Sequence, residues 1–147
     1  MIFLKENKNV DFLNTIYKTS EMGIVGINDV IDKAQKEKFR DFLNKQREEY
    51  NKILKKAEEL FTSFGMQEKE LSAFVKANSK VMSEMKLITN GSDETIAKMM
   101  MEGTNKGVIK INKAMNENTD ADQEVSDLAQ DLLTIMEHNL EELKIYL

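Results

Sequence analysis

The chain has 147 residues, a length that suits one domain with its own core, and with 41% hydrophobic and 32% charged residues it is not composed like a disordered chain. Its net charge of −5, with basic and acidic residues interleaved, argues against generic nucleic-acid binding, and the lack of cysteine excludes disulfides and thiolate metal sites. No apolar run is long enough to span a bilayer, so we expect a soluble cytoplasmic protein.

Apolar residues at helical spacing predict two helices in the first part of the chain. The first covers about 10–33, and the second runs from a turn at 34–36 to Phe64, with Gly65 as the residue that closes it. The chain contains no proline, where about seven would be average, and this favours long helices without kinks. Together the two helices form a predicted hairpin over 10–64.

Three further amphipathic stretches follow. Residues 67–89 predict a helix that connects the first hairpin to the next. Ser92 is the predicted N-cap of a helix that ends near Met115, and the last helix follows the polar loop 116–122. These two helices form a second predicted hairpin over 92–147.

The two hairpins resemble each other in sequence. A shift of 80 positions aligns Gly23 with Gly103 and Ile31 with Ile111, which indicates a duplicated helical hairpin. A helical connector of roughly 20 residues spans about 30 Å, enough to return along a bundle. We therefore predict a single all-α domain over 1–147: an up-down four-helix bundle with a helical crossover.

This arrangement is similar to that of the ferritin-like superfamily, with Glu21 in the first helix and Glu102 in its repeat partner. The chain also resembles small helical proteins of anaerobic Gram-positive bacteria through its segments 21–27 and 96–109. The second resemblance implies a bacterial protein but no activity.

The ferritin-like resemblance implies a di-iron or manganese site made by carboxylates from four helices. The candidates are Glu21, Glu49, Glu102 and Glu137. The superfamily's two Glu-x-x-His motifs are missing, because Asn51 and Leu140 occupy the histidine positions. We therefore expect no metal, no cofactor and no catalytic residue.

Two amides fall near the middle of apolar helix faces. Gln46 and Asn139 either fix the helix register, as buried polar residues do in coiled coils, or line a small ligand cavity with Ser20 and Tyr50. Glycines inside the helices also have two possible roles: they allow close helix packing, or they leave space for a bound group. The pocket candidates are Gly23, Gln46, Gly103 and Asn139.

Other features allow a partner or a ligand. His138 should face solvent and could bind a metal only with Glu141 or Glu142. Residues 99–101 are three methionines that could form an adaptable partner surface, as could the apolar residues 2–4. We predict a non-enzymatic binding or assembly module that forms a homo-oligomer or binds a protein partner. The alternatives are a degenerate di-metal carboxylate protein and a small-ligand carrier.

Overall fold

The computed structural model describes residues 2–78 and 91–147, and the side chains of 8–77 and 91–147. Within these ranges the chain forms five α-helices and no strand, so the protein is all-α there, as the sequence predicts. The helices and their short 3-10 extensions are α1 (Ile2–Val30, extended by Ile31–Lys33), α2 (Glu37–Ser63), α3 (Glu68–Asn78), α4 (Asp93–Glu117) and α5 (Gln123–Leu143, extended by Lys144–Tyr146).

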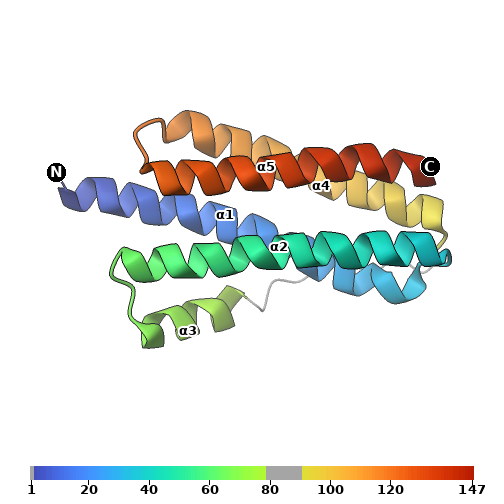
Figure 1. The fold of residues 1–147 in the computed structure, drawn as a ribbon, viewed down its shortest axis with the longest axis horizontal. Helices are drawn as coiled ribbons and strands as arrows, with labels where there is room; N and C mark the ends of the chain where they lie inside the picture. The colour runs from blue at the N-terminus through green and yellow to red at the C-terminus, as the bar shows by residue number, and fades with distance from the viewer. Residues whose placement is uncertain (1, 79–90) are drawn as a thin grey trace.

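The four long helices lie side by side around one core. The helices α1 and α2 form one antiparallel pair, and α4 and α5 form the other (Figure 1). The pairs meet where α4 contacts α1 and α5 contacts α2, and α1 also contacts α5. Both α2 and α4 run in the same direction, so the chain must travel back along the molecule between them (Figure 1).

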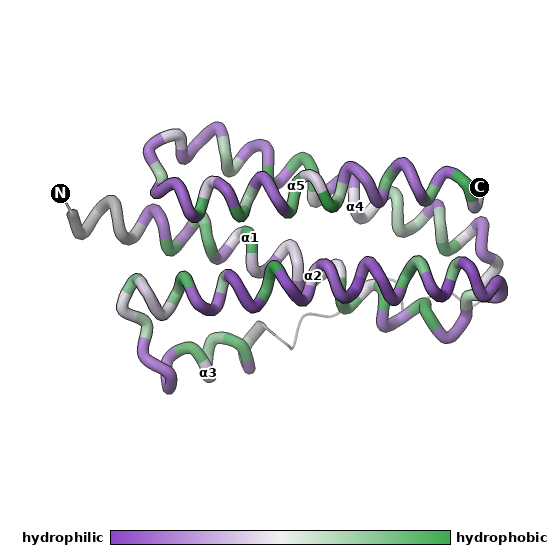
Figure 2. Tube along the Cα trace, viewed as in Figure 1, coloured by the Kyte–Doolittle hydropathy of each residue, from purple (hydrophilic) through white to green (hydrophobic). Residues whose placement is uncertain are grey.

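Each long helix buries one stripe of apolar residues. Hydrophobic and hydrophilic residues alternate along every long helix (Figure 2), as expected when one face of each helix packs inward. The buried apolar residues form one continuous cluster with members on α1, α2, α4 and α5. No helix in the described part of the chain is both long enough and apolar enough to cross a membrane.

The short helix α3 returns along α2 and is held by aromatic rings. Phe74 of α3 packs against Tyr17 of α1 and Phe61 of α2, with ring centroids 5.2 and 5.0 Å apart. This contact anchors the first half of the predicted crossover 67–89. Its second half lies outside the described residues.

Two helix ends have the caps that the sequence predicts. Gly65 follows α2 with a φ of 96°, the left-handed conformation for which glycine is favoured. The Ser92 side chain accepts a hydrogen bond from the Thr95 amide at 3.2 Å, so Ser92 is the N-cap of α4. Both predictions are confirmed.

The predicted start of the first helix, at residue 10, is wrong. The helix α1 begins at Ile2, since no glycine or proline interrupts the segment before Val10. Asn9, only 1% exposed, shows why this early part belongs to the bundle: its Oδ1 accepts a hydrogen bond from the Asp122 amide at 2.9 Å. The contact ties α1 to the start of α5.

A second polar contact ties the opposite end of the bundle. The Asp93 carboxylate accepts hydrogen bonds from the amides of Gln35 and Lys36, at 2.7 and 3.0 Å. Arg40 donates to the Ala34 carbonyl at 2.8 Å and so closes the same turn. The first residue of α4 therefore stabilises the turn that leads into α2.

Candidate functional site

The four long helices meet in the middle of the bundle at four polar side chains and one glycine. We call the set Gly23, Gln46, Tyr50, Thr104 and Asn139 the central polar layer. The Tyr50 ring lies directly on Gly23, because a Cβ added there would stand 2.8 Å from its Cε2 atom. The Tyr50 hydroxyl lies among the side chains of Asn139 on α5 and Thr104 on α4, which interact with it. Glycine at position 23 thus makes room for the ring.

The surroundings of Tyr50 keep it protonated. Burial raises the pKa of its hydroxyl to about 12, while the neighbouring Asn139 and Thr104 side chains act in the opposite direction. The residue is 3% exposed. At neutral pH, Tyr50 is a neutral hydrogen-bonding group inside the bundle.

Two amides of the layer have side-chain atoms without a hydrogen-bond partner among the described residues. Gln46 and Asn139 are each 1% exposed. Neither Nε2 nor Oε1 of Gln46 has a partner, so this finding does not depend on which atom is nitrogen and which is oxygen. Nδ2 of Asn139 is also without a partner in hydrogen-bonding geometry, although the side chain lies near Tyr50.

These two amides lie at a recess between α2 and α5. The recess has a volume of about 110 Å³. It is lined by Phe42, Lys45, Gln46, Glu49, His138, Asn139 and Glu142. Its base is therefore formed by neutral amides, and its rim carries charges of both signs.

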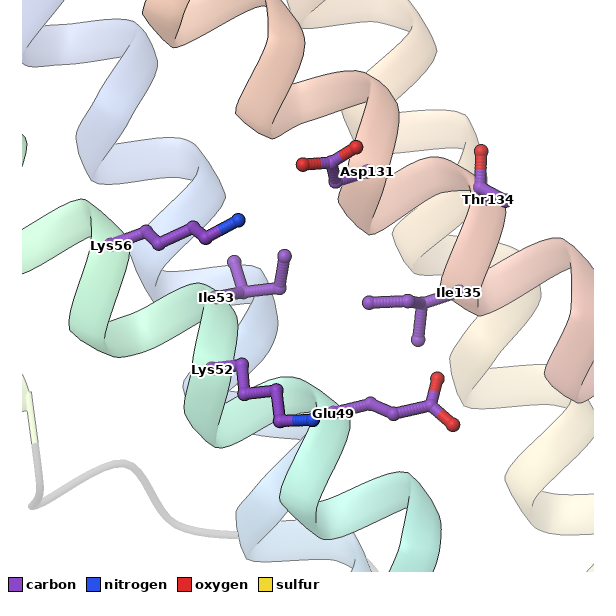
Figure 3. A pocket seen from close by; sticks show the side chains of 7 residues that line it. All are labelled: Glu49, Lys52, Ile53, Lys56, Asp131, Thr134 and Ile135. Carbon is purple, nitrogen blue, oxygen red and sulfur yellow. The ribbon is translucent and has the colours of Figure 1, made fainter.

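A wider groove continues along the same two helices and shares Glu49 with the recess. It has a volume of about 310 Å³ and is shown in Figure 3. Lys56 and Asp131 extend toward each other across it, and Ile53 faces Ile135 below them (Figure 3). None of the buried side-chain atoms found without a partner in the described residues belongs to the groove lining. Of the five unpartnered atoms, Asn14 Oδ1 and Asp29 Oδ2 lie on α1, and the other three belong to Gln46 and Asn139.

The structure brings three of the four predicted pocket residues into one layer. Gly23, Gln46 and Asn139 all belong to it. Gly103 does not, because it is exposed and a Cβ there would meet nothing within 4 Å. The neighbouring Thr104, 9% exposed, faces inward instead. The sequence-based prediction placed Gly103 on the inward face of this helix, where the structure has Thr104.

The other helix-interior features have structural explanations. Gly107 permits close packing, since a Cβ there would lie 2.9 Å from Sδ of Met136. The Ser20 hydroxyl donates to the Ile16 carbonyl at 2.9 Å, so its proton is used within its own helix. Of the three methionines at 99–101, Met100 is buried and the other two are half-buried.

The four candidate metal ligands do not come together. Glu102 and Glu137 are exposed, whereas Glu21 and Glu49 are half-buried. No three His, Asp or Glu side chains in the described ranges are placed to share a metal ion. Burial and the nearby Glu58 carboxylate raise the pKa of Glu21.

The glutamates on the first hairpin also affect a tyrosine. Burial raises the pKa of Tyr17 to about 12, and Glu58 and Glu21 add to this shift. His138 is exposed as predicted, with its Nε2 3.9 Å from Oε1 of Glu142. This single contact between neighbouring helical turns does not by itself make a metal site.

The large hydrophobic side chains that face solvent do not lie on one element. Met22 is on α1, Ile109 is on α4, and Ile145 and Leu147 lie at the end of the chain. Isolated exposed hydrophobic residues are ordinary on a protein surface. The predicted partner surface at residues 2–4 belongs to α1, but its side chains lie outside those described.

A family model described as "Domain of unknown function (DUF2383)" matches residues 8–117. The matched range extends from α1 to the end of α4. It includes every member of the central polar layer except Asn139, which lies on α5. No curated protein and no solved structure matches the chain.

Proposed function

We propose that this chain, which belongs to the DUF2383 family, is a non-enzymatic binding module with a ferritin-like bundle shape. The observation that carries the proposal is the pair of buried amides, Gln46 and Asn139. Both have side-chain atoms without a partner in the described residues, and both residues are among the lining of the recess between α2 and α5. Of the binding and assembly roles that the sequence leaves open, this recess favours the binding of a small molecule.

The energetic argument compares an amide with an apolar residue at the same place. A buried polar group without a hydrogen bond costs about 1–3 kcal/mol. Gln46 and Asn139 occupy positions on apolar stripes where leucine or methionine would carry no such cost. A ligand that satisfies the amides provides a reason for keeping them.

The ferritin-like shape is supported by the helix directions. In ferritin-like bundles a long connection between the second and third main helices makes these two helices parallel. The helices α2 and α4 run in the same direction here (Figure 1), and α3 begins the return between them.

The residues of the layer suit binding better than catalysis. Gln46, Asn139 and Thr104 do not ionise in the physiological range, and the pKa of about 12 keeps Tyr50 neutral. Such groups can donate and accept hydrogen bonds but are poor acids and bases at pH 7. Glu102 and Glu137, which a di-metal enzyme would need inside the bundle, face solvent.

The side-chain amide signals in a ¹⁵N–¹H NMR spectrum test the binding role. The spectrum would be recorded with four small probes in turn: acetamide, acetate, ethylammonium and ethanol. We expect at least one probe to shift the NH₂ signals of Gln46 and Asn139 in a saturable way. The Gln46→Met variant should abolish the shift of Asn139. In a matched control, Gln130→Met replaces an exposed glutamine of α5 and should leave the response unchanged.

Two outcomes would contradict the proposal. The first is that no probe shifts either amide at concentrations up to about 100 mM, since even weak fragments bind in that range. The second is elemental analysis of protein purified without chelator that finds iron or manganese near one per chain. That result would support the degenerate di-metal role.

A further inference from the structure

We propose that the side of the bundle where α2 faces α5 opens locally, and that salt controls the opening. We call this side the α2–α5 seam. It consists of the residues between 42 and 56 on α2 and between 131 and 142 on α5 that line the recess or the groove. The opening itself does not depend on the proposed binding function, whereas its role as the entrance to the central polar layer rests on that function.

The opposite side of the bundle, where α1 faces α4, is held tightly. A Cβ added at Gly107 of α4 would stand 3.3 Å from Cγ2 of Thr19 on α1, so these two helices approach each other closely. Asn9 of α1 and Asp93 of α4 each accept hydrogen bonds from backbone amides in the turn of the other helix pair. Separating α1 from α4 would break these bonds together with the close packing. The two helix pairs are therefore joined firmly on this side.

The α2–α5 seam contains two hollows and unmet polar groups instead. The recess and the adjoining groove have volumes of about 110 and 310 Å³. Tyr50 of α2 interacts with Asn139 of α5, but both amide atoms of Gln46 and Nδ2 of Asn139 have no partner among the described residues. Water that enters an opened seam hydrates these atoms, and this gain offsets part of the packing that is lost. Local opening of the seam is therefore less costly than unfolding of the bundle.

Contacts beyond both ends of the seam keep the opening local. Tyr146, which follows α5, stacks on Phe39 of α2 with ring centroids 4.4 Å apart. At the other end, the hydrogen bond from the Asp122 amide to Asn9 holds the start of α5 on α1. The parts of α2 and α5 between these anchors can move apart while the ends of the bundle stay in place.

The seam must open before solvent or a ligand contacts the two amides. Gln46 and Asn139 are each 1% exposed. Both residues belong to the recess lining, but their unpartnered atoms are buried. A molecule that stays in the recess of the closed structure therefore does not reach these atoms. They become accessible when α2 and α5 move apart.

Opposite charges face each other across the seam and hold it closed. The lysines and carboxylates that line it are Lys45, Glu49, Lys52 and Lys56 on α2, and Asp131 and Glu142 on α5. Lys56 and Asp131 extend toward each other (Figure 3), yet no ion pair of 4.0 Å or less joins α2 to α5 among the described residues. The attraction therefore acts over a longer distance through solvent, where salt at about 0.1 M screens it within roughly 10 Å. Rising salt weakens the attraction and favours the open seam.

Hydrogen exchange of side-chain amides, followed by NMR in the protein without ligand, measures the opening directly. The NH₂ groups of Gln46 and Asn139 exchange only when water reaches them, whereas the exposed Asn105 of α4 is a reference that needs no opening. We expect both buried groups to exchange at least about tenfold more slowly than Asn105, but faster than global unfolding allows. Their exchange should depend on urea much less than equilibrium unfolding does, because a local opening exposes little surface. Raising NaCl from about 0.02 M to about 0.5 M should speed both at least about twofold relative to Asn105.

Charge reversal on α5 gives a matched pair of variants. Asp131→Lys places a like charge opposite Lys56 and should speed the exchange of Gln46 and Asn139 at least about threefold at about 0.1 M salt. Glu137→Lys makes the same change of net charge at an exposed position of α5 outside the seam, and should leave the exchange nearly unchanged. Circular dichroism would verify that both variants keep the parent's helix content.

Three outcomes would overturn the inference. If the two buried NH₂ groups exchange as fast as that of Asn105, water already reaches the layer and no opening is needed. If they exchange with the rate and urea dependence of global unfolding, the seam does not open locally. If salt and Asp131→Lys have no effect, or Glu137→Lys acts equally, the charges of the seam do not control it. None of these outcomes decides the binding function, which the probe titrations test separately.

Discussion

The polar side chains at the two ends of the bundle have hydrogen-bond partners, whereas some of those in its middle do not. At one end Asn9 accepts a hydrogen bond from the Asp122 amide, and at the other the Asp93 carboxylate accepts bonds from the amides of Gln35 and Lys36. These contacts join segments far apart in sequence. In the middle, Gln46 and Asn139 lie as deep as Asn9 and deeper than Asp93, yet both amide atoms of Gln46 and Nδ2 of Asn139 lack a partner in the described residues.

The difference separates polar groups that hold the fold from polar groups that remain available. A hydrogen bond to a loop amide stabilises the turn that carries it, so the end contacts need no role beyond structure. An unpartnered buried amide costs free energy, and a bound ligand, an ordered water or a role in setting the helix register offsets that cost. Polar burial with partners is explained by the fold, whereas polar burial without partners marks a position to test for a ligand.

Substitutions at two glycines test the packing of the middle layer and have the largest expected effect. Gly23→Ala should destabilise the protein by about 1–3 kcal/mol, because the new Cβ would stand 2.8 Å from the Tyr50 ring. Gly103→Ala, at an exposed site with nothing within 4 Å, should stabilise it by about 0.5–1 kcal/mol. Urea denaturation measures both. Equal effects of the two substitutions would mean that Tyr50 does not pack on Gly23.

Asn9 tests the structural role of the end contacts. Asn9→Ala should cost about 1–3 kcal/mol of unfolding free energy, since it leaves the Asp122 amide without its acceptor. The control Asn105→Ala changes an exposed asparagine of α4 and should have little effect. Chemical denaturation of the two variants compares them directly. A loss below about 0.5 kcal/mol at Asn9 would remove the contrast between the ends and the middle.

Alkaline pH should weaken the fold through Tyr50 and Tyr17. Both pKa values are raised to about 12 in the folded protein, so the unfolded chain loses these protons first, near pH 10. The associated stability is complete below pH 10 and declines between pH 10 and 12, by at most about 1.4 kcal/mol per pH unit for each tyrosine. Absorbance at 295 nm follows the ionisation. Titration of all tyrosines of the folded protein near pH 10 would contradict the burial of these hydroxyls.

Substitution of the candidate metal-binding carboxylates should change the stability of the protein least. Glu21→Gln should raise stability at pH 7 by a few tenths of a kcal/mol, because it removes a half-buried charge beside Glu58 whose pKa is raised. Glu102→Gln removes an exposed charge and should change nothing measurable. Thermal unfolding at pH 7 compares them. A clear loss of stability in Glu21→Gln would mean that this carboxylate has a favourable partner.

The sequence predicts the helices well because a bundle helix must bury one stripe of its surface. Gly65 and Ser92 end or begin helices through local chemistry, which can be recognised without a structure. The inward position of Thr104 was missed, because threonine and glycine are both weak markers of a buried face. Ile96, Met100 and Thr104 follow one another at intervals of four residues, and this helical spacing was the available signal for the correct inward face.

The site was only partly predictable for a different reason. Gln46 and Asn139 were recognisable because amides interrupt otherwise apolar stripes. Whether such amides have partners depends on distances between helices, which the pattern of one helix does not contain. The same holds for Asp93 and Asn9, whose partners lie 58 and 113 positions away in the sequence.

The unfolding free energy of Gln46→Met tests the central claim most directly. Methionine matches glutamine in length and flexibility but has no amide, so the variant removes the unmet hydrogen bonds while filling the same space. If Gln46 is kept for a ligand, the empty variant should be as stable as the parent or more stable, with the same dependence on urea. A loss of more than about 1 kcal/mol would show that the amide stabilises the bundle itself, and the binding account would fail.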